Sequence, residues 1–338
     1  MGWYRGTGNS MAVMFVAVFC LALLALAVFI ALSGKEPQPA GPDGADKVII
    51  SPEAKRSDLY REIEEKGADY RIKPVDAVVD PVWKAIPGYN GLEIDVDASY
   101  LEMVSAGKFD RSKIVFRQLA PGVKLDDLDP QPIYRGNPEK PMVAFLINVA
   151  WGNEYIPSIL ETLAHQQVKA TFFFDGSWVK RNPGLTVTIY NHNHEIGNHA
   201  YSHPDLKLCS EAKIRSEISK TNETIEDIVG VKPLWFAPPS GSFNELTVQI
   251  AHQLGLKTIL WTVDTVDWKD PEPAEMVRRV VSQVEKGSMV LMHPTKPTVE
   301  GLEAMITEIK QKGYHFGTVS DLMAENRIAD LLPEGGDG

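Results

Sequence analysis

The sequence predicts an α/β protein whose largest domain is a closed or nearly closed barrel of parallel strands and crossover helices. Three observations indicate this fold. From Pro141 onward, short apolar runs alternate with amphipathic segments of helical period, in about seven repeats. Each repeat has the length of a strand plus a helix, which parallel pairing requires. Side chains capable of chemistry recur directly after the apolar runs, at the strand ends where such barrels place their active sites.

The first element along the chain is an apolar run at residues 11–32, long enough to cross a bilayer as a helix. Arg5 precedes this run, which favours a single-pass signal-anchor at residues 1–33 in the cell membrane, with the main domain outside the cytoplasm. The alternative is a secreted protein, released by cleavage of a signal peptide near Ala31-Leu32-Ser33.

A small α+β domain is expected after a linker rich in proline and glycine. Ser51 and Pro52 suit the start of a helix that ends at Gly67. No constellation of chemically active residues is evident in this domain, so packing or binding of a protein partner is its expected role. The remaining elements expected in it are a short β-prone run at 47–50, strands at 70–79, 92–96 and 113–119, and a helix at 97–107.

The predicted domain boundaries follow from these changes in pattern. They are the linker at 34–46, the small domain at 47–125, a connector at 126–140, the barrel domain at 141–326 and a flexible tail at 327–338. Strands of the barrel are expected at 142–149, 168–174, just before His199, and at 234–236, 257–263, 288–292 and 314–318. Helices are expected at 154–165, 177–191, 210–228, 244–254, 273–284, 299–312 and in a short segment ending near 325, with Glu217 on a polar position of its helix.

Composition excludes several classes of function. The net charge of −11 argues against binding to nucleic acid, because neutralising phosphates requires a basic surface. Cys20 and Cys209 are the only cysteines of the chain, which excludes a disulfide framework and a thiolate zinc site.

The candidate site begins with His199 and His203. Their spacing of four places both imidazoles on one side of a helical turn or tight loop, which suits two nitrogen ligands on one metal ion. Other polar and aromatic side chains follow the remaining strands at the same end of the barrel, so we expect one pocket. They are Asn148, Val149, Trp151, Asp175, Pro239, Ser240, Asp264, Asp267, Trp268, Leu291 and His293.

These motifs, in this order, resemble the polysaccharide deacetylases, also called the NodB-homology or carbohydrate esterase family 4 domain. The resemblance covers residues 141–324, and it is strongest to a divergent branch associated with sporulation. It implies a distorted (β/α)7 barrel and metal-dependent removal of acetyl groups from N-acetylated sugars of peptidoglycan or chitin.

Several family motifs are retained. The resemblance assigns His199 and His203 to metal binding, and D-x-x-D-W and L-x-H stand intact at Asp264–Trp268 and Leu291–His293. His293 would be the general acid, oriented by Asp264 or Asp267. The side chains implied to line the substrate groove are Trp151, Trp268, Leu291, Pro239 and Ser240.

The departures from the family pattern concern catalysis. Asn148 stands where active relatives have the general base, and Val149 stands where they have the third metal ligand. Ala237 replaces the arginine that holds the base. An amide cannot accept a proton as a base, so these losses predict little or no activity. Asp175 is a candidate substitute for the missing carboxylates, with helix capping as the alternative, and Glu154 is another, with a place in the first turn of a helix as the alternative.

Three hypotheses follow. The favoured one is a deacetylase-fold protein of the cell envelope that retains a groove for cell-wall glycan, with zinc or another divalent metal bound weakly or not at all. The second is an active N-deacetylase with a rearranged site that uses Asp175, Asp264 or Asp267. The third is a structural protein of sporulation that acts through a protein partner.

Overall fold

The structure is a computed structural model that describes residues 50–328. The predicted signal-anchor at 1–33, the linker at 34–46, and the tail from residue 329 onward lie outside the described residues. Within residues 50–328, no helix is long and apolar enough to cross a membrane.

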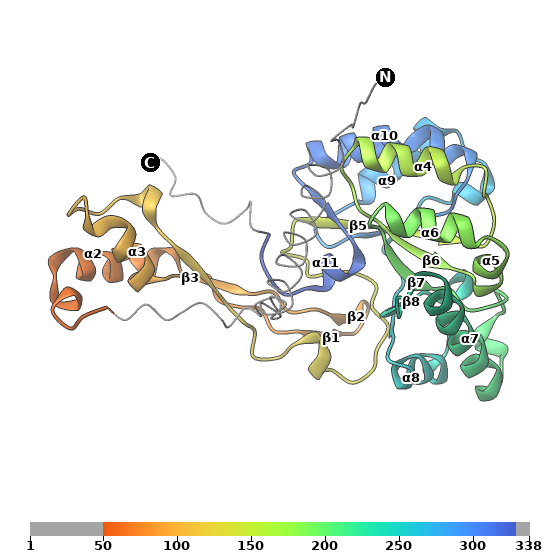
Figure 1. Cartoon of the computed structure of the whole chain (residues 1–338), viewed down its shortest axis with the longest axis horizontal. Helices are drawn as coiled ribbons and strands as arrows, with labels where there is room; N and C mark the ends of the chain where they lie inside the picture. Colours follow the sequence, from red (N-terminus) through yellow and green to blue (C-terminus); the bar gives the residue numbers. More distant parts are fainter. Residues whose placement is uncertain (1–49, 329–338) are drawn as a thin grey trace, which may run out of the picture. The chain divides into compact units, whose positions relative to one another are not determined.

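The barrel domain is built around a curled sheet of parallel strands (Figure 1). Its order is β10-β11-β5-β6-β7-β8-β9, and β12 also pairs with β5. The strands are β5 (Met142–Val149), β6 (Thr171–Phe174), β7 (Glu195–Asn198), β8 (Trp235–Phe236), β9 (Lys257–Thr258), β10 (Val263–Asp264), β11 (Met289–Met292) and β12 (His315–Gly317). The strand β5 is buried along its whole length, as expected for a parallel strand covered on both faces.

Helices follow most of the strands, which confirms the predicted α/β class. They are α4 (Ile156–His165), α5 (Gly176–Arg181), α6 (Pro183–Asn191), α7 (Glu211–Val229), α8 (Glu245–Gln253), α9 (Pro273–Gln283), α10 (Lys296–Gln311) and α11 (Val319–Met323). Helices α4 to α10 lie outside the sheet, whereas Val319, Leu322 and Met323 of α11 pack in the apolar cluster inside its curl. The longest of them, α7, begins where the Ser210 hydroxyl accepts from the Lys213 backbone N–H and ends at Gly230, whose φ is +71°.

The segment between α8 and α9 corrects the prediction of one strand at 257–263. Its first half, β9, pairs with β8, whereas its second half, β10, pairs with β11. The backbone changes partner in between: the Ile259 N–H donates to Phe236, and the Thr262 N–H donates to Met289. This one segment therefore contacts strands from both ends of the sheet, and the sheet curls as a result.

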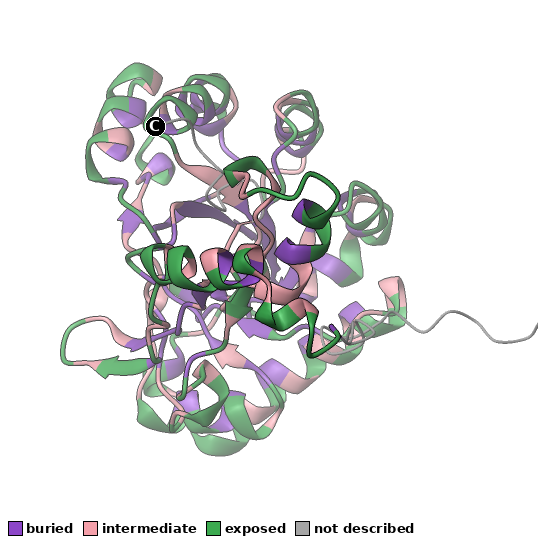
Figure 2. Ribbon diagram, turned by 90° about the vertical axis from the view of Figure 1, so that its left-hand side faces the viewer, coloured by how far each residue is buried: buried purple, intermediate pink, exposed green. Residues whose placement is uncertain are grey.

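Side chains of β5 alternate between two apolar clusters, since successive residues of a strand point to opposite faces. Val143, Phe145, Ile147 and Val149 pack in the cluster between the sheet and the helices. Residues 142, 144 and 146 belong to a second cluster inside the curl of the sheet. Figure 2 shows the buried residues concentrated along the sheet and the exposed ones on the surrounding helices. Asn148 continues the inner series, so the alternation itself directs it towards the interior.

The small N-terminal domain differs in detail from its prediction. Its elements are the 3-10 helix η1 (Ala54–Arg56), α2 (Asp58–Gly67), β1 (Val78–Asp80), β2 (Lys84–Ile86), β3 (Gly91–Ile94), α3 (Val96–Val104) and β4 (Phe116–Leu119). Ser57, rather than Ser51, caps α2 by accepting from the Tyr60 N–H, and Ser51 caps only the short turn before it. Asp95 caps α3, so this helix begins at 96. The predicted strand at 70–79 is reduced to β1 and two isolated bridges.

The predicted connector and tail make specific contacts. The Ile133 N–H donates to Thr258 O at 2.9 Å, and Ile133 O accepts from Leu260 N at 2.8 Å, so the connector is bound to the segment that carries β9. Arg327, predicted to begin the flexible tail, donates from Nε to Asn90 O at 2.8 Å.

Candidate active site

A cavity of about 440 Å³ opens at the carboxyl ends of the strands. The loops that follow β5, β7, β8, β10 and β11 all contribute to it, as expected for a curled parallel sheet. Its lining residues are Asn148, Ala150, Trp151, His199, His203, Ser240, Trp261, Asp264, Trp268, Leu291 and His293.

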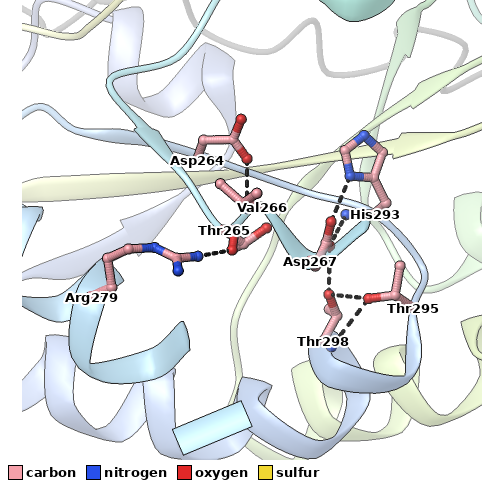
Figure 3. Close-up of polar contacts among 8 residues, drawn as sticks. All are labelled: Asp264, Thr265, Val266, Asp267, Arg279, His293, Thr295 and Thr298. Carbon is pink, nitrogen blue, oxygen red and sulfur yellow. Dashed lines mark hydrogen bonds and ion pairs between the residues drawn. The ribbon is translucent and has the colours of Figure 1, made fainter. Parts of the chain in front are cut away.

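His293 is held by the buried carboxylate of Asp267 (Figure 3). The Nδ1 atom of His293 lies 2.8 Å from Asp267 Oδ1, and its backbone N–H donates to Asp267 Oδ2 at 2.6 Å. The Thr298 hydroxyl also donates to Oδ2, at 2.7 Å. Both oxygens of Asp267 thus have hydrogen-bond partners and fix the imidazole, and His293 Nε2 has no partner among the described residues. The sequence left open which aspartate contacts His293; Asp264 instead accepts from the Val266 N–H at 2.8 Å.

His199 is buried beneath the cavity and hydrogen-bonded to the main chain. Its Nδ1 lies 2.7 Å from Ala237 O, and since a carbonyl can only accept, Nδ1 carries the hydrogen and Nε2 has a free lone pair. Burial lowers the pKa of His199 to about 3, with a smaller contribution from His203. His199 is therefore neutral at pH 7. The ring of His203 lies edge-on to that of His199, with centroids 5.2 Å apart.

The loop between these histidines is held in an uncommon backbone conformation. Ala200 and His203 have φ values of +60° and +56°, which side chains other than glycine adopt rarely. The Glu217 carboxylate on α7 compensates by accepting from the backbone N–H groups of Tyr201 and Ser202 at 2.9 and 2.7 Å. Glu217 was predicted on a polar position, but it is 4% exposed. The position of Glu217 along the amphipathic helix did not predict its hydrogen bonds to the histidine loop.

The positions of the missing catalytic groups are all in the interior. Asn148 is 4% exposed and lines the cavity, and its Oδ1 has no hydrogen-bond partner among the described residues. Val149 packs in the outer apolar cluster and does not line the cavity. Ala237 belongs to the inner cluster. The structure therefore brings one of these three positions into the cavity.

The two proposed substitute carboxylates lie elsewhere. Asp175 caps α5, with Oδ1 accepting from the Trp178 N–H at 2.8 Å. Burial raises the pKa of Asp175, and hydrogen bonds from Ser177 and Trp178 offset only part of this effect. Neither Asp175 nor Glu154 lines the cavity.

The ligand set is incomplete for a catalytic zinc ion. Catalytic zinc has three protein ligands of nitrogen, oxygen or sulfur. Among residues 50–328, no group of three or more His, Cys, Asp or Glu side chains is placed to hold a metal ion. His199 and His203 supply two imidazoles, and the third family position, Val149, is an apolar side chain directed into a core. The residues present do not fit a resident three-ligand zinc.

Aromatic side chains form the rim of the cavity. The Trp151 ring stacks on His293 with centroids 5.9 Å apart and planes 8° from parallel, and it is still 47% exposed. Trp268 is 56% exposed. Trp261 also lines the cavity and was missed from the sequence, because it falls inside the run expected to be one strand. Of the predicted groove residues, Pro239 is buried and is not part of the lining.

Comparison with known proteins identifies the family. A family model described as polysaccharide deacetylase matches residues 135–259. The crystal structure of BA3943, a CE4 family pseudoenzyme from Bacillus anthracis, superposes with a TM-score of 0.75 at 48% identity, over 81% of this chain and 97% of that chain.

The chain belongs to the polysaccharide deacetylase family.

Further relatives are similar over most of their own length. YlxY of Bacillus subtilis, an uncharacterized protein, is 51% identical over 83% of this chain and 88% of its own. PdaA of Bacillus subtilis, a peptidoglycan-N-acetylmuramic acid deacetylase, is 32% identical over 58% of this chain and 76% of its own. A BA3943 mutant described as having restored enzymatic activity matches with a TM-score of 0.75 at 47% identity. The predicted resemblance is thus confirmed for the family.

Proposed function

We propose that this chain binds the glycan of the cell wall, of the peptidoglycan or chitin type, through a polysaccharide deacetylase domain with little or no deacetylase activity. The domain is a distorted (β/α)7 barrel in this proposal. One observation carries it: the cavity retains the His293–Asp267 pair, while the side chain at the base position is the amide of Asn148.

The chemistry of amide hydrolysis explains why an amide at the base position implies little or no deacetylase activity. Water attacks an acetamide only if a base removes its proton, and an amide side chain has no basic lone pair at neutral pH. Loss of a general base costs on the order of 10²–10⁴ in rate. His293 can still offer a proton to a leaving amine, but an acid without a base does not complete the reaction. A divalent metal, bound weakly or not at all, does not replace that base.

Binding needs only the groups that remain. Trp151 and Trp268 expose flat rings at the rim, and flat rings of this kind stack on the apolar faces of sugars. Leu291 is 3% exposed and forms an apolar wall. Ser240, His203 and Asp264 line the same cavity and can exchange hydrogen bonds with hydroxyl groups.

The proposed location follows from the ligand. Cell-wall glycan lies outside the cytoplasm, and peptidoglycan is the substrate named for the relative PdaA. A single-pass signal-anchor at 1–33 would present the barrel to that glycan, and secretion after cleavage would do the same. A role in sporulation, and a protein partner for the small domain, belong to this proposal as well.

The second candidate function is an active deacetylase with a rearranged site. One observation favours it: the charge of His203 acts on the Asp175 carboxyl and lowers its pKa, although burial outweighs this effect. The Asp175 carboxylate is near enough to His203 to influence it. Its capping of α5 opposes a catalytic role.

Both functions are tested on the full chain purified in detergent. Acetate released from cell-wall glycan, zinc retained after dialysis and glycan affinity are measured on the same sample. Glycan binding that is lost in Trp268→Ala, without acetate release, supports the binding protein. Zinc at one per chain, with acetate release abolished in His199→Ala, supports the enzyme and overturns the proposal.

A further inference from the structure

We propose that the cavity selects glycan units that carry a free 2-amino group over units that carry a 2-acetamido group. The chain would then recognise glycan that a deacetylase has already modified. This inference rests on the proposed function, because it takes a glycan as the ligand and names the chemical form of it that is bound.

The charge of the cavity favours a cation. Among residues 50–328, its lining contains no lysine and no arginine, one carboxylate, that of Asp264, and three imidazoles, those of His199, His203 and His293. Asp264 Oδ1 accepts from the Val266 N–H, and its other oxygen has no donor among the described residues. A protonated sugar amine would supply that donor together with a compensating charge, and charge-assisted hydrogen bonds are about twice as strong as neutral ones.

The aromatic lining adds to this preference. Indole rings attract cations placed over their faces. Trp151, Trp261 and Trp268 all line the cavity. The Lys269 ammonium already lies 4.8 Å from the Trp268 ring centroid, so this rim accommodates a cation on an indole face. Within residues 50–328, no lysine or arginine covers the other two rings, which stay available to a ligand.

The cavity also contains hydrogen-bond acceptors that have no donor. His199 keeps a free lone pair on Nε2, because its Nδ1–H is used by Ala237 O. Asn148 is 4% exposed, and its Oδ1 has no hydrogen-bond partner within residues 50–328. An amine brings two or three N–H donors to such acceptors, whereas an acetamide brings one N–H and adds an acceptor oxygen. Acetylation also removes the positive charge, so the pairing with Asp264 and with the indole faces is lost.

The experiment compares two ligands of equal length. A glucosamine oligomer and an N-acetylglucosamine oligomer are titrated calorimetrically into the full chain in detergent, at about pH 7 so that ordinary imidazoles stay mostly uncharged, with a chelator present to remove divalent ions. We expect the glucosamine oligomer to bind about tenfold more tightly, as for one added charge-assisted interaction. In Asp264→Asn, which keeps an oxygen for the Val266 N–H, the ratio of the two affinities should fall close to one.

A matched variant separates this local effect from general attraction to an acidic protein. Asp129 is an exposed carboxylate that lines a separate cavity beside α8, so Asp129→Asn removes the same charge elsewhere. The affinity ratio should persist in this variant, and an equal fall in both variants overturns the inference. Equal or tighter binding of the N-acetylated oligomer overturns it and leaves the proposed function standing. Binding of neither oligomer overturns both.

Discussion

His199 Nδ1 donates a hydrogen bond to the main-chain carbonyl of Ala237, 2.7 Å away. This contact joins the loop after β7 to the end of β8, at the position where the family's arginine has been lost. Because the acceptor belongs to the backbone, the identity of side chain 237 does not affect it. The imidazole therefore keeps its orientation after the catalytic carboxylates and their arginine have been replaced.

Zinc should stabilise the protein only slightly. His199 and His203 offer two imidazoles, and Val149 is directed into the outer apolar cluster. A ligand present at a hundred times its Kd stabilises a fold by about 2.7 kcal/mol. For a site with two imidazole ligands, micromolar zinc should be far less than a hundred times the Kd. We therefore expect it to leave the Tm of the full chain unchanged in scanning calorimetry. A rise of several degrees that disappears in His203→Ala would show a complete metal site.

Stability should fall in acid partly because of Glu217. Burial alone raises the pKa of Glu217, but hydrogen bonds from Lys213 and Ser202 lower it by more, so its pKa in the folded state lies below the unfolded value. Its contribution is thus present above the unfolded pKa and is lost as the pH falls through the folded pKa. We expect Glu217→Gln to lower the Tm at pH 7 by several degrees, since a buried charged hydrogen bond contributes roughly 1–3 kcal/mol.

The difference in Tm between Glu217→Gln and wild type should shrink as the pH falls below about 4. Glu223 lies on the same helix, is exposed, and serves as the control. Glu223→Gln should change the Tm little at any pH. A Tm difference for Glu217→Gln that stays constant from neutral to acid pH would contradict the assigned role of the charge.

Trp151→Ala should weaken glycan binding. Its ring is stacked on His293 and half exposed at the rim, so one face remains for a sugar. Loss of an aromatic contact of this kind costs about 0.5–1.5 kcal/mol beyond the buried area, or roughly twofold to twelvefold in Kd. Titration calorimetry with a glycan oligomer measures the effect. Trp151→Phe keeps an aromatic face and should recover most of the affinity; equal loss in both variants would point to disturbed folding instead.

The regular parts of the fold were predictable because their periodicity is local. The strand β5 has the predicted limits, Met142–Val149, since an apolar run interrupted by Asn148 alone, between Lys140-Pro141 and Gly152-Asn153, admits few alternatives. The break between β9 and β10 was not predictable, because it arises when one segment changes hydrogen-bond partner between two distant strands. Ser57 displaced Ser51 as the cap of α2 for a similar reason: both serines suit a helix start, and local sequence does not choose between them.

The residues that line the cavity were predictable where a sequence motif places them at the end of a strand. Asn148, His199, His203, Trp268 and His293 all line one cavity. Contacts that depend on packing were missed. Glu217 reaches the histidine loop from a helix, Trp261 enters the cavity through the break in a strand, and Val149 turns away from the cavity.

The central claim is that neutral side chains at the catalytic positions leave a glycan-binding pocket without hydrolysis. It is tested most directly by acetate release from N-acetylated cell-wall glycan, measured side by side for wild type and for Asn148→Asp/Val149→Asp/Ala237→Arg in the presence of zinc. Since Val149→Asp places a carboxylate in an apolar cluster, Asn148→Asp/Ala237→Arg is assayed as well, and circular dichroism verifies that each variant is folded. We predict no release above background by wild type and measurable release by the folded triple variant. Wild-type release at a rate equal to or above that of the variant would contradict the account.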